Sequence, residues 1–458
     1  MPKESRRWDR TLNGNRRLPV WGSHHPGITP VSLRGVRGAS RRAAQGPASE
    51  NLIRELARVE CYAAAVNLRV VSRKCGSRPR SCARVALAVC AAVMVPAACT
   101  SSKARIEAFR TGKATTRATD DLRRGMNFGD AMDAPNEGDW GFVISASDFR
   151  AVHEAGFDHV RVPMRFSNHT DSRPPYAIER HFMKRVDWVV DQALSNDLGV
   201  IIDVHHFQGM MQAPRAWEGH LISIWQQIAT RYKGMPRAVV YEILNEPTDK
   251  LTAEIWNPIL ARTIAAIRAI DPDRTIIVEG AHWASAKDLR DTLAVPAGDA
   301  HLVGSFHMYA PMYFTHQGFG WMPPHFGTRG VIFPGPPPQP VQPTGAALAF
   351  PESRTFFEGY NHDPPETNPG GPSAIVEQME LAAAFAKRTG LRVYLGEFGA
   401  GINADIASRA RWAHTARVEA EKRGFGWGYW DFTSNFAAYS SLGLVGSWIP
   451  QMKAALLD

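Results

Sequence analysis

Two glutamates follow two short apolar segments of this sequence. Residues 238–244 are mainly apolar and β-branched and lead to Asn245, Glu246 and Pro247, and residues 391–396 lead in the same way to Glu397. Such runs predict buried strands, and a proline directly after the first glutamate stops that strand. Two carboxylates delivered by two strand ends could serve as the acid and the nucleophile of glycoside hydrolysis. The alternative is that each glutamate only caps the following helix.

The chain from residue 121 onward alternates strand-like and helix-like segments, which is typical of an α/β fold. The expected strands cover 122–128, 157–163, 199–205, 238–243, 275–279, 302–307, 391–396 and 425–432. The expected helices cover 145–155, 182–194, 219–232, 253–270, 374–388, 404–423 and 451–457. Eight strand–helix units in about 340 residues predict one (β/α)8 TIM barrel over 121–458. A doubly wound open sheet is the alternative, but it calls for a glycine-rich phosphate turn after an early strand, and the sequence has none there.

Polar and titratable residues recur where these strands end. The carboxyl ends of barrel strands form the face on which barrel enzymes carry their sites. The candidate site residues are Arg161, His205, Asn245, Glu246, His307, Tyr309, Glu397 and Trp430.

A long segment, residues 310–373, separates the sixth strand from the next helix. It is rich in proline and in aromatic residues, and long segments of this kind are usually functional or disordered. Aromatic rings mixed with prolines and glycines predict a semi-rigid wall beside the site. The alternative is a surface loop that packs only on itself.

The charge of +9 belongs to the N-terminal part of the chain. Residues 1–120 carry 23 Lys and Arg against 7 Asp and Glu, while the rest carries 30 against 37. We interpret residues 1–72 as a basic segment that is disordered or lies upstream of the true start, rather than as a nucleic-acid-binding or folded domain.

A secretory signal is predicted over 73–99. A basic stretch precedes the apolar run 85–95, which is too short to span a bilayer permanently and is followed by small residues. Cys99 stands where a bacterial lipoprotein would be lipidated, although Pro96 departs from that pattern, so cleavage without lipidation stays open. Residues 100–120 are interpreted as a linker. We expect a secreted, periplasmic or cell-surface protein.

The motifs around these strand ends resemble glycoside hydrolase family five, the cellulase-like barrels. The resemblance covers about 121–445 and keeps the order of the motifs. It rests on Arg124-Gly125-Met126-Asn127, Arg161-Val162-Pro163, Asp203-Val204-His205-His206, Asn245-Glu246-Pro247, His307-Met308-Tyr309, Glu397-Phe398-Gly399 and Trp427-Gly428-Tyr429-Trp430.

The resemblance implies a retaining β-glycoside hydrolase in which Glu246 is the acid/base and Glu397 the nucleophile. Asn245 would hydrogen-bond the sugar 2-hydroxyl. Since neighbouring strand residues face opposite ways, Asn245 and Glu246 can both face the substrate only if the pleat breaks there, as at a bulge.

The other site residues take supporting roles by the same resemblance. Tyr309 and Arg161 would donate to Glu397, and His307 would line the subsite beside the acid/base. Trp430 would be a platform for the sugar that is cleaved, whereas Trp427 could equally be a core residue. His205 matches the family's site histidine.

No cofactor and no metal is expected. His205 and His206 could suggest a metal, but adjacent strand residues diverge and make a poor chelate, so we interpret His206 as a packing or supporting residue. All five cysteines lie in residues 1–99, so the barrel has neither a disulfide nor a cysteine metal site.

The expected substrate is a β-linked glucan, and the expected activity is that of an endo-β-1,4-glucanase acting as a monomer. β-Mannan, β-1,3-glucan and short oligoglucosides remain alternatives within the family. A barrel that binds polysaccharide without cutting it is the alternative of another class.

Overall fold

The computed structural model describes residues 101–440 and 446–458. The predicted basic segment over 1–72 and the predicted signal over 73–99 lie outside these residues.

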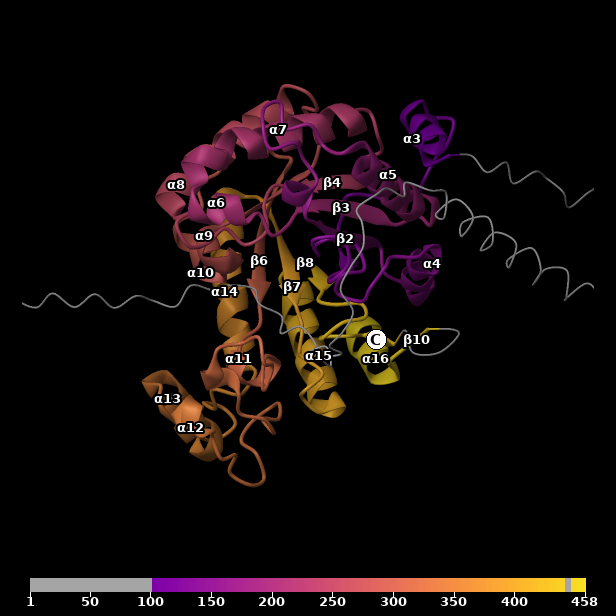
Figure 1. The fold of residues 1–458 in the computed structure, drawn as a ribbon. Helices are drawn as coiled ribbons and strands as arrows, with labels where there is room; N and C mark the ends of the chain where they lie inside the picture. Colours follow the sequence, from indigo (N-terminus) through magenta and orange to yellow (C-terminus); the bar gives the residue numbers. More distant parts are fainter. Residues whose placement is uncertain (1–100, 441–445) are drawn as a thin grey trace, which may run out of the picture. The chain divides into compact units, whose positions relative to one another are not determined.

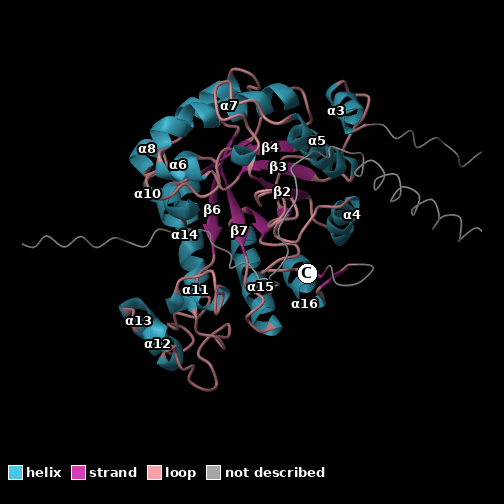
Figure 2. Ribbon diagram, in the orientation of Figure 1, coloured by secondary structure: helices cyan, strands magenta, loops and turns pink. Residues whose placement is uncertain are grey.

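Eight parallel strands close into a barrel in sequence order, with β1 pairing both β2 and β8 (Figures 1 and 2). The predicted (β/α)8 TIM barrel is therefore confirmed. The strands are β1 (Arg124–Asn127), β2 (His159–Met164), β3 (Gly199–Val204), β4 (Val239–Glu242), β5 (Ile276–Glu279), β6 (Leu302–Met308), β7 (Arg392–Phe398) and β8 (Gly426–Tyr429).

The barrel interior is layered along the strands. Near the N-terminal end the inward side chains form an apolar cluster: Leu122, Ile201, Val240, Ile277, Val303 and Tyr394. Four of these strands carry a buried polar residue two positions after the apolar one, and therefore on the same face. These residues are Asp203, Glu242, Glu279 and Ser305. The interior thus changes from apolar to charged toward the carboxyl ends of the strands.

Helices surround the strands in Figure 2. The apolar stripe predicted around residues 182–194 is buried in α5, where Phe182, Val186 and Val190 face the core. The helices between strands and after β8 are α4 (Ala146–Ala155), η1 (Phe166–Asn168), α5 (Arg180–Ser195), α6 (Gln208–Gln212), α7 (Pro214–Tyr232), α8 (Ala253–Arg268), α9 (Ala281–Ala284), α10 (Ala286–Asp291), α14 (Ser373–Thr389), α15 (Ile406–Lys422) and α16 (Pro450–Leu457), and the two short strands β9 (Tyr439–Ser440) and β10 (Ser447–Trp448) pair with each other.

The expectation of a linker over residues 100–120 is wrong for its first half. Ser102–Arg110 forms helix α3, which lies against α5 (Figure 1). Ile106 and Phe109, three residues apart on one helix face, are buried against the barrel. Arg105 also pairs with Asp191 of α5. The segment was predicted to be a linker because most of its residues are small or polar. The two apolar residues at helical spacing explain why it forms a packed helix instead.

The segment 310–373 contains four short helical elements and forms a lobe beyond α14 and α15 in Figure 1. Much of it packs on itself: Phe356 stacks on Tyr313 at 4.4 Å and on Tyr360 at 5.5 Å between ring centroids. The alternative of a self-packed loop thus describes α13 (Pro351–His362) and the residues that contact it, among them Tyr313. The elements are α11 (Met312–Thr315), η2 (Pro324–Phe326), α12 (Gly345–Leu348) and α13 (Pro351–His362).

The first part of this segment reaches the site instead. Phe319 and Met322 form a small apolar cluster with Phe436, and Tyr309 and Trp430 pack against this cluster. The part of the segment that forms this wall is therefore residues 316–326, from His316, which contacts Phe436, to Phe326, which also packs against the cluster.

Among the described residues, none of the helices has the length and apolar character that crossing a membrane would require.

Candidate active site

Arg161 is the centre of a buried polar network at the carboxyl end of the barrel. It projects from β2, and its side chain has no exposed surface. Its guanidinium pairs with Glu242 through two hydrogen bonds of 2.7 and 3.0 Å. It also donates to Asn127 (3.0 Å), Asp203 (3.1 Å), Asn245 (2.7 Å) and Glu397 (2.8 Å). One cation therefore orients side chains from β1, β3, β4, β7 and the segment after β4.

Glu397 is held from two sides. Arg161 Nη1 donates to one of its carboxylate oxygens, and the hydroxyl of Tyr309 donates to the other at 2.8 Å. The structure thus places both residues where the sequence predicted donors to Glu397. These two hydrogen bonds fix the orientation of the Glu397 carboxylate.

A bulge aims Glu397 into the barrel mouth. The pairing of β6 with β7 slips by one residue, so that Phe306 pairs with Leu395 but His307 pairs with Glu397. The extra residue is Gly396, where a Cβ atom would come within 2.9 Å of His307 Nε2. The bulge that the sequence argument expected at Asn245 and Glu246 therefore lies in the other strand.

A left-handed residue aims Glu246 instead. β4 ends at Glu242, and Glu246 has φ of +48°, a conformation that glutamate rarely adopts. The backbone N–H of Glu246 donates to Glu279 Oε2 at 2.7 Å, which holds the chain in this turn. The break in the pleat is real, but it is made by this turn rather than by a bulge.

His307 bridges the two glutamates. Its Nδ1 lies 2.9 Å from Glu246 Oε1 and 3.6 Å from Glu397 Oε2, and its Nε2 lies 2.9 Å from Glu279 Oε1. Burial lowers the pKa of His307, but the carboxylates of Glu397, Glu279 and Glu246 outweigh burial and raise that pKa well above its usual value. His307 is thus a buried residue beside the acid/base candidate, and its raised pKa favours the imidazolium form. That it lines a sugar subsite stays a prediction.

The pKa values of Glu246 and Glu279 are shifted in opposite directions. Desolvation raises the pKa of Glu246, and repulsion by Glu397 and Glu279 adds to this effect against the attraction of His307. Burial would also raise the pKa of Glu279, but His307 and Arg161 prevail and lower it to about 2. Glu246 is therefore the carboxyl in this pair that most readily carries a proton.

Glu246 and Glu397 lie close together. One oxygen of each, together with a nitrogen of His307, falls within 4.8 Å of the others. In retaining glycosidases the two carboxyl groups are roughly 5–5.5 Å apart, whereas inverting enzymes separate them by about 6.5–9.5 Å to admit a water. The spacing in this barrel therefore matches the retaining geometry.

Asn245 presents its amide in one defined orientation. The atom that faces Arg161 must be the oxygen, because a guanidinium has donors only. The amide nitrogen, a donor, is consequently turned away from Arg161. This side chain is buried, with 5% of its surface exposed.

Trp430 and His205 lie side by side at the site. Their rings are parallel, with an interplanar angle of 7° and centroids 6.0 Å apart. Gly129 makes room for Trp430, because a Cβ atom there would lie 2.6 Å from the indole. Nδ1 of His205 lies 2.5 Å from Asp203 Oδ2, so that the carboxylate can accept a hydrogen bond from the ring. Trp427, by contrast, is fully buried core.

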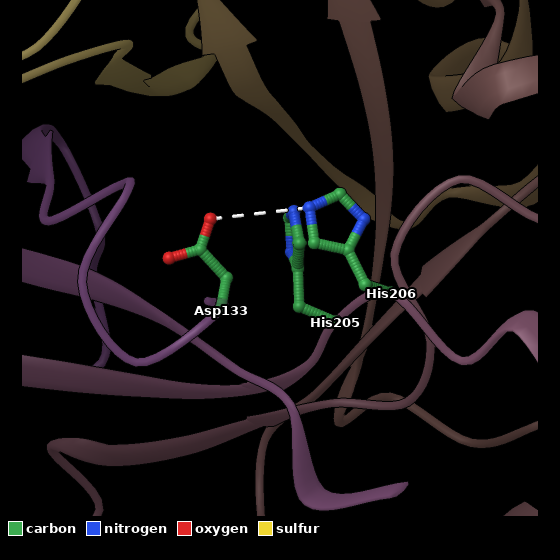
Figure 3. Close-up of side chains that lie close together, drawn as sticks. All are labelled: Asp133, His205 and His206. Carbon is green, nitrogen blue, oxygen red and sulfur yellow. Dashed lines mark ion pairs between the residues drawn. The ribbon is translucent and has the colours of Figure 1, made fainter. Parts of the chain in front are cut away.

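His206 does not diverge from His205 as strand neighbours would. It follows the end of β3 with φ of +49°, and the two imidazole rings approach to 4.4 Å between centroids. Figure 3 shows both rings beside Asp133, whose Oδ2 lies 4.0 Å from His206 Nε2. The premise that these two side chains diverge is therefore wrong.

Sequence reasoning missed four members of the network: Asn127, Asp203, Glu242 and Glu279. The last three share a signal, since each is an acidic residue two positions after an inward-facing apolar residue of the same strand. A carboxylate inside an otherwise apolar parallel strand needs a buried partner, which Arg161 supplies to Asp203 and Glu242.

A closed (β/α)8 barrel that carries a close pair of glutamates at the carboxyl ends of β4 and β7 has the architecture of a retaining glycoside hydrolase. The sequence pattern of the family described as cellulase (glycosyl hydrolase family 5) matches residues 124–436. The chain belongs to this family.

Relatives and solved structures agree with this assignment. Endoglucanase H of Acetivibrio thermocellus is 30% identical over 307 residues, which cover 67% of this chain but only 29% of that protein. Endoglucanase C of the same organism is 24% identical over 63% of this chain and 84% of its own length. A hyperthermophilic endo-β-1,4-glucanase solved in complex with substrate is 32% identical, with a TM-score of 0.63 over 77% of this chain and 99% of that chain. The Cel5A of Thermotoga maritima, solved in complex with mannotriose, is 34% identical with the same TM-score.

Proposed function

We propose that this protein is a retaining endo-β-1,4-glucanase that uses Glu397 as the nucleophile and Glu246 as the acid/base. The observation that carries the proposal is the spacing of the two carboxyl groups, whose nearest oxygens lie within 4.8 Å. The two environments assign the roles. Glu397 accepts from Arg161 and Tyr309, which orient it for attack, while the raised pKa of Glu246 suits a proton donor.

In the first step Glu397 attacks the anomeric carbon, and Glu246 gives its proton to the departing glycosidic oxygen. This forms a covalent glycosyl–enzyme bond and releases the leaving chain. In the second step Glu246 takes a proton from a water, the resulting hydroxide attacks the anomeric carbon, and Glu397 departs. Two inversions give net retention.

His307 supports both steps through charge. Glu246 becomes an anion after it gives up its proton, and the imidazolium 2.9 Å away stabilises that anion until water is activated. Asn245 turns its amide nitrogen away from Arg161, and we propose that this nitrogen donates to the sugar 2-hydroxyl. Trp430, parallel to His205, offers an aromatic plane for a sugar ring.

The substrate proposal rests on the relatives, which are named endoglucanases. β-Mannan is a second candidate, because one related structure was solved with mannotriose. β-1,3-Glucan and short oligoglucosides are handled by similar machinery. Reducing-sugar release and product lengths on cellulose, mixed-linkage glucan and mannan decide among them. A barrel that only binds polysaccharide is disfavoured, because the catalytic pair is complete.

Azide rescue tests the assignment of the two glutamates. Glu397→Ala with an activated aryl β-cellobioside and azide should give the α-glycosyl azide, since only one inversion remains. Glu246→Ala should give the β-glycosyl azide, since azide then replaces water in the second step. Near wild-type turnover of a natural glucan by either variant, or an α-anomer as the first product of the unaltered enzyme, would refute the assignment.

We further propose that the enzyme is exported and acts as a monomer. The basic stretch and apolar run over 73–99 support export, and a polymeric glucan cannot enter the cell intact. Fractionation and labelling with a radioactive fatty acid, in the native chain and in Cys99→Ala, distinguish lipidation from simple cleavage. Light scattering of the purified protein tests the oligomeric state.

A further inference from the structure

Asp133, His205 and His206 form a three-residue cluster at the carboxyl end of the barrel. One potential donor atom from each side chain lies within 4.8 Å of the other two. Asp133 comes from the segment after β1, and the two histidines follow β3. In Figure 3 the carboxylate and both rings point into one common space.

Two of the three side chains, those of Asp133 and His205, are held in place by contacts outside the cluster. The carboxylate of Asp133 accepts from the backbone N–H groups of Asp130 and Ala131, at 3.2 and 2.8 Å. Nδ1 of His205 faces Asp203, which leaves Nε2 as the nitrogen turned to the cluster. A carboxylate on the far nitrogen of an imidazole is the usual support of a histidine that binds metal.

We propose that these three side chains bind a divalent transition metal, with zinc as the representative ion, and that the bound metal inhibits hydrolysis reversibly. Two imidazole nitrogens and one carboxylate oxygen are the donor set of zinc sites that keep a fourth position open. Donor atoms at most 4.8 Å apart need to move inward by only about 0.7 Å each to reach bonds of about 2.1 Å. His206 is partly exposed, with 40% of its side-chain surface accessible, so an ion can enter from solvent.

Inhibition follows from the position of the cluster, and this part rests on the proposed function. The ring of His205 lies parallel to Trp430, the proposed sugar platform. A metal on His205 Nε2 therefore takes a contact away from the substrate and places a hydrated divalent ion beside it. Substrate and metal should exclude each other, so the inhibition should be competitive.

The chain offers a matched control at another group of the same composition. His169, Glu179 and His181 also bring three donor atoms within 4.8 Å, and they lie at and before the start of α5 rather than in the catalytic network. His181 is 78% exposed. His181→Asn removes one donor from that group, just as His206→Asn removes one from the cluster. Asparagine is chosen at 206 because it tolerates the left-handed backbone found there.

The experiment compares the full chain with these two variants, each referred to its own rate without zinc. Zinc chloride should raise the KM of the unaltered enzyme for an aryl β-cellobioside and leave kcat unchanged. His206→Asn should need at least tenfold more zinc for the same inhibition, while His181→Asn should follow the unaltered enzyme. Equal inhibition of the unaltered enzyme and His206→Asn overturns the proposal, as does inhibition that lowers kcat alone.

Calorimetric titration with zinc gives a readout that needs no hydrolysis. The cysteines of residues 1–99 are common to all three proteins, so their zinc binding cancels in the comparison. His206→Asn should bind one zinc ion fewer than the unaltered chain. An unchanged zinc stoichiometry and affinity overturns the site, even if the protein cleaves no β-glycan and the proposed function itself has failed.

Discussion

Tyr309→Phe removes one of the two donors that hold the proposed nucleophile and changes little else. The Tyr309 hydroxyl donates to Glu397 Oε2 at 2.8 Å, and Arg161 holds the other oxygen. Burial and the charge of Glu397 raise the pKa of Tyr309 well above its usual value, so the phenol is a donor at every working pH. Phenylalanine keeps the ring, which packs edge-on against His316 at 4.9 Å.

The magnitude follows from the type of bond that is lost. A hydrogen bond to a charged group contributes about 1.5–3 kcal/mol. Because Glu397 must be aligned as it attacks, this loss should fall on the transition state of glycosylation and lower kcat/KM by about 10- to 150-fold. Arg161 remains in place, so the variant should retain measurable activity.

The assay is kcat/KM on an aryl β-cellobioside, a parameter that reports the steps up to glycosylation. Tyr313→Phe is the control, because that hydroxyl pairs at 2.8 Å with Ser353 in the self-packed lobe. The control should stay within about twofold of the unaltered enzyme. A Tyr309→Phe enzyme with unchanged kcat/KM, or a control with an equal loss, would refute the claim that this hydroxyl acts on the nucleophile.

Four other outcomes are expected. The kcat/KM of the unaltered enzyme should fall as pH rises through the raised pKa of Glu246, since the acid must carry its proton. Glu246→Ala should lose this fall at high pH when the substrate is a dinitrophenyl cellobioside, whose leaving group needs no proton. Arg161→Lys should lower the free energy of unfolding by about 3–5 kcal/mol in urea titrations, because several buried carboxylates lose their partner. Trp321→Ala should raise the KM for long glucans by about 2- to 13-fold, which corresponds to the loss of one stacking contact. The KM for aryl glycosides should not change, since this ring is 39% exposed and stacks on Phe319 at the outer edge of the site. The pKa of Glu279 is lowered to about 2 in the folded state, so the stability that this carboxylate adds to the fold should be complete above about pH 4.5 and disappear as pH falls toward 2. Between these pH values the Tm of Glu279→Gln should change less than the Tm of the unaltered enzyme.

The barrel itself was predictable because most of its strands are short, mainly apolar runs and helices such as α5 carry one apolar stripe. Local pattern decides both, and the strand ends that carry Glu246 and Glu397 follow directly from it. The short helix α3 was missed because its two buried residues, Ile106 and Phe109, lie in a segment whose composition is otherwise that of a linker.

The backbone conformations that orient the two glutamates could not be predicted from the local sequence. The turn at Glu246 depends on Glu279, which is 33 residues away, and the bulge at Gly396 depends on His307 in the neighbouring strand. Asp203 and Glu242 could have been found, since an acidic residue inside an apolar strand demands a buried cation and Arg161 is one within the barrel.

The network around Arg161 constrains how this enzyme can diversify. Five partners share one guanidinium, so a substitution at any of them changes the hydrogen bonding of the others at the same time. Adaptation to a new β-glycan, in nature or in laboratory evolution, should therefore leave this network untouched. Substitutions that change substrate choice should accumulate in positions such as residues 316–326, which reach the site but lie outside the network.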